Sequence, residues 1–182
     1  MIIPIIETER LRLRAHRPAD LADCAAMWGD ARVTRHIGGK PFAIDEVWAK
    51  ILRYAGHWSL LGYGYWVIED RASGGFLGEA GLADFKRGIG PGFDGAPEIG
   101  WVLAPAAQGA GVATEAVRAV LGWADRHLNR IRTVCLIDPE NRGSVRVAEK
   151  CGYREFHRTT YKDHPVVLFE REEAGDEVGR DS

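Results

Sequence analysis

A run of small residues near the middle of the chain has a composition that could serve chemistry. The stretch APAAQGAGVATEA covers residues 104–116, with glycines at 109 and 111 and alanines at 110 and 113. It joins the strand-like segment EIGWVL to a helix that is expected to begin near Gly111. The first N–H groups of a helix have no partner inside it and lie at the positive end of the helix dipole, so they favour an anion. Because no bulky side chain intervenes, phosphate oxygens could reach these amides.

Three interpretations of this stretch differ in the ligand that they imply. Residues 109–114 match the dinucleotide-binding pattern GxGxxG except at the last position, Thr114, and no acidic residue follows a second strand about 20 positions later. A Walker phosphate loop is also incomplete, because the only GK pair, at 39–40, has Thr34 in place of the first glycine and Pro41 after it. A tight turn that binds nothing is the third interpretation.

The elements that must position this stretch alternate along the chain. Apolar residues at i, i+3, i+4 and i+7 indicate helices, and alternating polar and apolar residues indicate strands. We expect helices over 17–30, 43–62, 111–128 and 141–150, strands over 10–16, 62–70, 74–86, 98–103 and 131–137, and two more strands within 155–172. The Gly- and Pro-rich segment 87–97 is expected to be a loop. These patterns predict one α+β domain over residues 1–172 and a polar, disordered tail at 173–182.

Composition and charge exclude several classes of protein. The 182 residues are 46% hydrophobic and 27% charged, which is typical of a soluble globular domain. A formal net charge of -2 gives no electrostatic footprint for nucleic acid or for an anionic membrane. The first residues lack the pattern of a secretory signal, and no run of roughly 18 apolar residues occurs. We therefore expect a cytoplasmic protein.

The cysteines and histidines form no pattern of a metal site or of a disulfide framework. Cys24, Cys135 and Cys151 are widely spaced and odd in number, which fits a reducing compartment. No CxxC motif occurs, and none of the six histidines belongs to an HExxH or HxxxH pair. We therefore predict no bound metal.

Two motifs in sequence order resemble the signatures of one superfamily, the GNAT acetyltransferases. Gln108, Gly111 and Ala113 match its Q/R-x-x-G-x-G/A signature. The later segment NRGSVRVAEKCGY is similar to the family's N-x-x-S/A…K-x-G-F/Y signature at Asn141, Ser144, Lys150, Gly152 and Tyr153. The opening segments ETERLRLR and RPAD resemble the subgroup of ribosomal-protein N-terminal acetyltransferases (RimJ/RimL-like). Together these segments extend the resemblance over about residues 7–172.

This resemblance implies a fold, a cosubstrate and a set of binding residues. The implied fold is α+β, with a mostly antiparallel central sheet whose middle strands splay apart and with helices on both faces. The implied cosubstrate is acetyl-CoA, its pyrophosphate on the backbone of the small-residue stretch and its pantetheine along the preceding strand. The binding residues implied in this way are Trp101, Val102, Leu103, Gln108, Gly109, Ala110, Gly111, Val112, Ala113, Thr114, Asn141 and Ser144.

Two glutamates and a serine are the candidates for the chemistry of amine acetylation. The attacking amine must be neutral, whereas α-amino groups titrate near ~8 and lysine near ~10, so a base should take a proton and an acid should protonate the leaving thiolate. Glu98 is the predicted base because it heads the strand that would hold the thioester, with Glu79 on the neighbouring strand or a water relay as alternatives. Ala148 stands where many family members carry a tyrosine acid, so Ser144 is the predicted donor to the sulfur.

Several of these residues also have a purely structural interpretation. Asn141 is a natural N-cap of the predicted helix and Gly152 a natural cap at its C-terminal end. Cys151 is expected to be a buried thiol rather than a nucleophile, and Tyr153 is expected to pack in the core. Glu98 could be a strand-end charge that faces solvent.

Two classes of function remain open. The first is an N-acetyltransferase that moves acetyl directly from acetyl-CoA to a primary amine, and the second is a non-catalytic acyl-CoA-binding module, which Ala148 favours. The resemblance favours a protein N-terminal α-amine as acceptor, with amino acids, polyamines or aminoglycosides as alternatives and a homodimer as one option. The loop 87–97 and the two N-terminal helices should wall the acceptor cleft, where Asp84, Asp94 and Glu98 could hold a cationic substrate.

Overall fold

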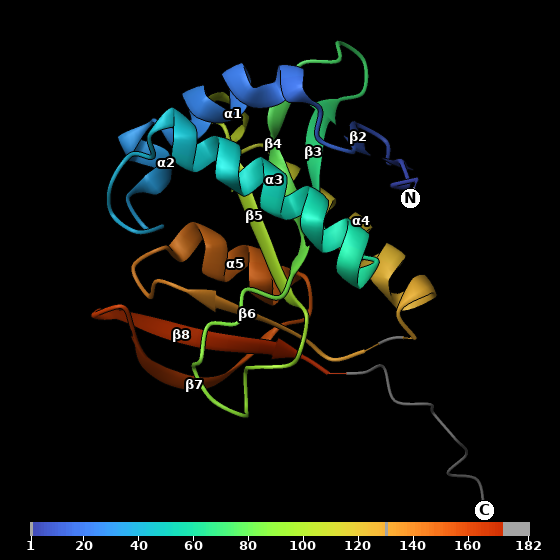
Figure 1. Ribbon diagram of the computed structural model, residues 1–182. Coiled ribbons are helices and arrows are strands. Elements are labelled where there is room, and N and C mark those ends of the chain that lie inside the picture. The colour runs from blue at the N-terminus through green and yellow to red at the C-terminus, as the bar shows by residue number, and fades with distance from the viewer. Residues whose placement is uncertain (1, 130, 173–182) are drawn as a thin grey trace, which may run out of the picture.

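One sheet of eight strands organises the chain (Figure 1). The computed structural model describes residues 2–129 and 131–172, and the tail predicted at 173–182 lies outside the described residues. The sheet has the order β1-β2-β3-β4-β5-β6-β8-β7, and all neighbours are antiparallel except β5 and β6. The strands are β1 (Ile6–Glu7), β2 (Leu11–Arg14), β3 (Tyr65–Asp70), β4 (Phe76–Ala83), β5 (Glu98–Leu103), β6 (Thr133–Ile137), β7 (Arg154–Tyr161) and β8 (His164–Arg171).

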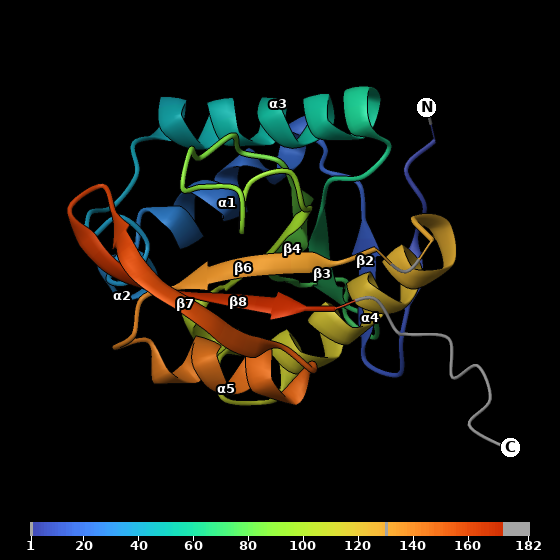
Figure 2. The same ribbon diagram turned by 90° about the horizontal axis from the view of Figure 1, so that it is seen from below.

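Helices cover both faces of this sheet, as Figure 2 shows with α3 above it and α4 and α5 below it. The helices are α1 (Leu21–Trp28), α2 (Ala31–Thr34), α3 (Ile44–Leu61), α4 (Val112–His127) and α5 (Arg142–Lys150), with 3₁₀ turns at Pro18–Asp20 and Pro105–Ala107. The predicted α+β class and mostly antiparallel sheet are confirmed. The sequence did not predict β1 and α2, because elements of two and four residues are too short to carry a periodic pattern. Among the helices of the described chain, none has the length and apolar character needed to cross a lipid bilayer.

The two middle strands of the sheet separate, as predicted. β5 pairs with β4 along its whole length, from Glu98 to Leu103. On its other side β5 has only one register partner in β6, the pair Glu98 and Val134. Figure 1 shows β5 and β6 diverging from that end. Beyond Glu98 the edge of β5 that faces β6 is therefore open.

Apolar packing fixes α4 against the sheet. One apolar face of this helix is buried, including Val117 and Val120. Three tryptophans join α3, β3 and α4: the ring centroids of Trp58 and Trp66 lie 4.6 Å apart, and those of Trp66 and Trp123 lie 5.3 Å apart, both in edge-to-face contact. Such aromatic contacts add to the free energy gained by burying the rings. The start of α4 is thereby held at the end of β5.

Two glycines allow Tyr65 to lie across the sheet toward β5. Tyr65, Gly81 and Gly100 are neighbours across β3, β4 and β5. A Cβ at Gly81 would overlap the backbone of Gly64 and Tyr65, and a Cβ at Gly100 would overlap the Tyr65 hydroxyl. Tyr54 of α3 stacks on Tyr65, with ring centroids 4.3 Å apart. These two rings therefore cover the backbone of β5 on the α3 face of the sheet.

Gly81→Ala is expected to destabilise the protein by about 1–3 kcal/mol, because the added methyl group meets backbone that cannot move aside. Gly56 is the matched control: it lies inside α3, and a Cβ there would meet nothing within 4 Å. Gly56→Ala is expected to stabilise by roughly 1 kcal/mol, from helix propensity alone. Urea unfolding followed by circular dichroism measures both, and a Gly81→Ala variant as stable as the wild type would contradict the close strand contact.

Candidate active site

The small-residue stretch forms a row of exposed amides at the start of α4. Gly109 has φ 81° and Gly111, the N-cap of α4, has φ 79°, both in the left-handed region that favours glycine. The first helical hydrogen bond runs from the Glu115 N–H to the Gly111 carbonyl. Within residues 2–129 and 131–172, no acceptor lies on the N–H groups of residues 109–114, and a Cβ on Gly109 would meet nothing within 4 Å. We call residues 109–114 the amide cradle.

Arg10 lies beside the amide cradle, and no sequence motif indicates it. Its Nη1 donates to the Ala110 carbonyl at 2.9 Å and its Nε to Glu115 Oε2 at 2.7 Å. Thr8 Oγ1 donates to the same carboxylate at 2.6 Å. These bonds fasten the cradle to the turn between β1 and β2. They also pair the Arg10 guanidinium with Glu115 beside the amides, so the pair adds little net charge there.

The predicted binding residues of β5 and α5 lie at one end of the sheet. Because β5 and β6 run parallel, the segments that follow them, 104–111 and 138–141, emerge at the same edge. Trp101, Val102 and Leu103 lie on the part of β5 whose edge is open. The Gln108 side chain donates from Nε2 to the Leu103 carbonyl at 3.2 Å, which ties the cradle to the strand.

The helix α5 begins with a cap and carries the serine that was predicted as a proton donor. Asn141 is the N-cap, and its Oδ1 accepts the Ser144 N–H at 3.1 Å, so its structural interpretation is observed. The Ser144 hydroxyl is partly exposed and has no hydrogen-bond partner in the described part of the chain. Ala148 is fully buried. The position at which many family members carry a tyrosine therefore lies in the hydrophobic core of this protein. Gly152, with φ 86°, follows the helix end as predicted.

Glu98 is buried and forms a two-pronged ion pair with Arg87. Arg87 Nε donates to Glu98 Oε2 at 2.6 Å and Nη2 to Oε1 at 2.7 Å. The guanidinium lies between two rings, 4.9 Å from the centroid of Phe85 and 5.1 Å from that of Tyr161. Burial raises the pKa of Glu98 above its ordinary value, although Arg87 opposes the shift. The solvent-facing interpretation of Glu98 is therefore wrong.

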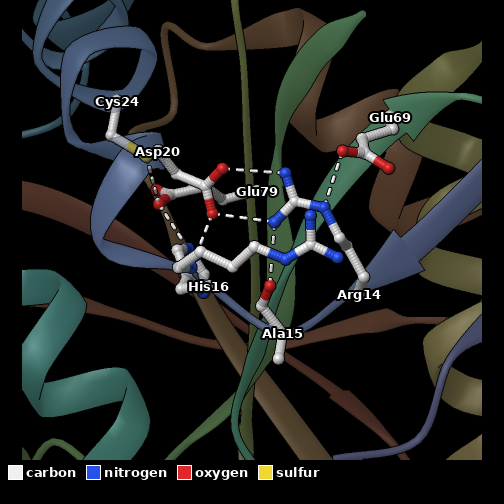
Figure 3. A network of polar contacts seen from close by, with 8 residues as sticks. Arg14, Ala15, His16, Asp20, Cys24, Glu69 and Glu79 are labelled. Carbon is white, nitrogen blue, oxygen red and sulfur yellow. Dashed lines mark hydrogen bonds and ion pairs between the residues drawn. The ribbon is translucent and has the colours of Figure 1, made fainter. Parts of the chain in front are cut away.

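Glu79 lies deeper, at the centre of a hydrogen-bonded cluster under α1 (Figure 3). Its Oε1 lies 2.7 Å from His16 Nε2 and 3.4 Å from Cys24 Sγ, and its Oε2 accepts Trp28 Nε1 at 2.8 Å. Burial alone would raise the pKa of Glu79, but His16, followed by Trp28 and Cys24, lowers it below the ordinary value. The side-chain ligand atoms of His16, Cys24 and Glu79 lie within 4.8 Å of one another, a spacing that a metal could also use. The contacts here satisfy both carboxylate oxygens without an ion.

A second buried set of ion pairs, from Arg14 to Asp20 and Glu69, holds the segment that carries His16. Arg14 Nη1 and Nη2 donate to the Asp20 carboxylate at 2.7 and 2.8 Å, and Nε donates to Glu69 at 2.6 Å. Asp20 also accepts the Arg17 N–H at 2.6 Å. Figure 3 shows these bonds closing the corner between β2 and α1. His16 lies within this corner, so its position beside Glu79 is fixed by the backbone.

The acids that were expected to hold a cationic substrate are already engaged. Asp84 forms an ion pair with Lys86. Asp94 accepts the Gly90 N–H at 2.7 Å. Together with the Arg87–Glu98 pair, these contacts leave the segment 84–98 without a carboxylate that is free of partners.

The chain belongs to the GNAT acetyltransferase domain family, whose model matches residues 10–154. The Bacillus subtilis protein YkkB is 31% identical over 172 residues, which cover 90% of this chain and 93% of that protein. The structure of a Bordetella pertussis protein assigned to the GnaT family is 34% identical and superposes with a TM-score of 0.83, covering 93% of this chain and 99% of that one.

Two coenzyme A complexes have the same fold at lower identity. One is the spermidine N-acetyltransferase of Vibrio cholerae with CoA and spermine, with a TM-score of 0.71, 20% identity and coverage of 92% of this chain and 98% of that one. The other is a ribosomal L7/L12 alpha-N-protein acetyltransferase with coenzyme A, with a TM-score of 0.74, 16% identity and coverage of 93% and 98%. Coenzyme A is therefore bound in both of these structures.

The hydrogen bonds to Glu79 should make stability depend on pH. Because the folded pKa of Glu79 is lowered from 4.5, its contribution is present above that pH and is lost as the pH falls through the lower folded value. Glu79→Gln is expected to cost about 1–3 kcal/mol at pH 7 and to flatten the fall in unfolding free energy between about pH 5 and 3. Urea unfolding at a series of pH values measures this, with Glu149→Gln on the exposed face of α5 as control. Identical pH dependence in wild type and Glu79→Gln would contradict the assignment.

Proposed function

We propose that this protein transfers an acetyl group from acetyl-CoA directly to a primary amine within a ternary complex. The observation that carries the proposal is the amide cradle, whose N–H groups have no acceptor among the described residues and lie at the end of a strand with an open edge. Diphosphate oxygens accept hydrogen bonds from such amides. The amides of pantetheine could pair with the backbone of residues 101–103, as an added strand would.

The proposed reaction forms a bond between the amine nitrogen and the thioester carbonyl carbon and breaks the bond from that carbon to sulfur. The ammonium first gives a proton to a base, and the thiolate finally gains one. Backbone N–H groups on the open edge of β5 are suited to stabilise the negative charge that develops on the carbonyl oxygen. No covalent acyl-protein step is needed.

We assign the base to Glu98, acting directly or through one water. Burial brings its pKa closer to neutrality, as a general base requires. Arg87 occupies both carboxylate oxygens, but a cavity of about 10 Å³ lined by both residues has room for about one water. Glu79 is the weaker candidate, because its pKa is lowered and both of its oxygens accept hydrogen bonds.

We assign Ser144 to the leaving sulfur. Its hydroxyl is not engaged in the described part of the chain and stands in the first turn of α5, beside the opening between β5 and β6. A serine hydroxyl is a poor acid, so it would donate a hydrogen bond or relay a proton from water rather than give up its own.

The acceptor and the cellular setting belong to the same proposal. A protein N-terminal α-amine and the RimJ/RimL-like subgroup are supported by the N-terminal motif and by the fold shared with the L7/L12 enzyme. A small amine is supported in the same way by the spermidine enzyme. Three free cysteines fit the reducing cytoplasm, and a homodimer is one option for the assembly.

A non-catalytic acyl-CoA-binding module is the second candidate function. Two observations favour it: Ala148 replaces the family tyrosine, and Arg87 neutralises Glu98. Release of free thiol from acetyl-CoA over a panel of amines separates the two functions. A module of this kind would bind coenzyme A by calorimetry and release no thiol with any amine.

Ala110→Glu is expected to weaken coenzyme A binding at least about tenfold, because it adds a negative charge to the cradle. Ala110 is exposed and its backbone is ordinary, so the substitution should leave the fold unchanged. Ala110→Lys is the matched variant of opposite charge and should bind coenzyme A as well as the wild type or better. Calorimetry measures both, and equal affinities for the two variants would show that the diphosphate lies elsewhere.

Glu98→Gln is expected to lower kcat/KM about 10²- to 10⁴-fold at pH 7, with little change in coenzyme A affinity. The pH profile of kcat/KM between 6 and 9 should then follow the ionisation of the acceptor amine alone, because the second group that must be deprotonated is gone. Glu149→Gln, on the exposed face of α5, is the control. Full turnover by Glu98→Gln across this range would remove Glu98 from the mechanism.

A further inference from the structure

Two cations on α3 form no ion pair in the described part of the chain. Lys50 and Arg53 lie one turn apart on this helix. The ion pairs around them join other groups: Lys40 with Glu46, Lys86 with Asp84, and Arg87 with Glu98. Within residues 2–129 and 131–172, no carboxylate lies within ion-pair distance of either Lys50 or Arg53.

Aromatic rings, rather than acids, surround the Lys50 ammonium. Its Nζ lies 4.1 Å from the ring centroid of Trp28, 5.0 Å from that of Phe42 and 5.9 Å from that of Tyr54. Ring faces attract a cation but provide no negative charge. Burial lowers the pKa of Lys50 to about 8, and the charges of Arg53 and Arg87 act in the same direction, although Glu79 opposes them. Lys50 is half-buried, and a cation partly removed from water without an ionic partner costs free energy, so its retention among these rings favours a ligand.

Arg53 extends the same positive region toward the base. Its guanidinium lies 4.7 Å from the centroid of Phe85, and that of Arg87 lies 4.9 Å from the same ring. Glu98 already neutralises Arg87. Lys50 and Arg53 are therefore the two charges in this region that an incoming anion could pair with.

This region reaches the strand on which the thioester would lie. Lys50 faces the ring of Tyr54, Tyr54 stacks on Tyr65, and the Tyr65 hydroxyl lies at Gly100 of β5. These two rings connect the Lys50 ammonium to β5 on one face of the sheet. The charge of Arg53 acts on the Glu98 carboxylate, so an acceptor with its amine at Glu98 would present a neighbouring anionic group to these cations.

We infer that the acceptor carries a carboxylate or phosphate near its amine, and that Lys50 and Arg53 bind this group. This inference rests on the proposed acetyl transfer and names the class of acceptor. It replaces the expectation of a purely cationic substrate, because Asp84, Asp94 and Glu98 are already engaged. An α-amino acid, an aminoalkyl phosphate or the N-terminus of a peptide with an acidic side chain would each supply this chemistry.

Matched pairs of acceptors test the inference. Each α-amino acid is compared with its amide, phosphoethanolamine with ethanolamine, and acidic with neutral N-terminal peptides, by thiol release at fixed acetyl-CoA. We expect kcat/KM to be at least about tenfold higher for the anionic member, mainly through KM. The pair with the largest ratio identifies the source of the anion. Equal or better turnover of the neutral members would overturn the inference.

Lys50→Met and Arg53→Met are expected to remove most of this preference by raising KM for the anionic acceptors. Lys40→Met, at an exposed lysine 3.9 Å from Glu46, is the control and should keep the preference. Lys50→Met should not lower the melting temperature, since it removes a buried charge, and Lys50→Arg should restore part of the preference. A preference that survives in both methionine variants would refute the role of these cations.

Binding separates this inference from the proposed function. If no amine releases thiol, the proposed function fails, and calorimetry in the presence of coenzyme A then tests the acceptor class directly. Tighter binding of the anionic member of each pair, lost in Lys50→Met, would still support the inference. Equal binding of both members would refute it whether or not the protein is an enzyme.

Discussion

The separation of β5 from β6 is the constraint on which the site depends. A strand inside a sheet normally satisfies its backbone groups on both sides, but beyond Glu98 the β5 edge that faces β6 has no partner strand. The N–H groups of the amide cradle are unsatisfied at the end of the same strand, within the described chain. Apolar packing offsets the cost of the open strand edge and of the unsatisfied amides. The helix α4 is buried against the sheet through Val117 and Val120, and contacts between tryptophan rings hold it in position. A ligand that accepts hydrogen bonds along its length would complete the strand and the helix start together.

The two buried carboxylates of the α3 face show how environment divides their roles. Glu79 and Glu98 lie on adjacent strands, yet the pKa of Glu79 is lowered and that of Glu98 is raised. Around Glu79, three donors outweigh burial, whereas for Glu98 burial outweighs the Arg87 pair. Opposite pKa shifts in neighbouring acids distinguish a carboxylate that is held in its charged form from one that takes up a proton more readily. This contrast is the physical reason for assigning the base to Glu98 rather than to Glu79.

The features that sequence could predict are those fixed by neighbouring residues. The glycines at 109 and 111, the Asn141 cap and the turn at Gly152 each follow from local backbone geometry, and the structure shows all of these conformations. The side-chain environments of the site could not be predicted in this way. Arg10 meets Glu115 across 105 positions of the chain, and Glu79 meets His16 across 63. Such contacts depend on how the strands are ordered, which no local pattern encodes, and the resemblance to the family gave only their general placement.

Two glycines on neighbouring strands, Gly81 and Gly100, explain why the two substrates would reach β5 from different directions. Gly81 and Gly100 have no side chains, so the Tyr65 ring lies over the strand and Tyr54 lies on that ring. The α3 face of β5 is thereby covered, and the backbone of the strand stays accessible along its edge toward β6. An extended chain such as pantetheine suits that edge, because it can pair with backbone groups in sequence. A short, charged acceptor suits the rim of the aromatic cover, where Lys50 lies over Trp28 and near Tyr54. The same glycines that admit the rings would therefore keep the two proposed binding regions apart while bringing both to one strand.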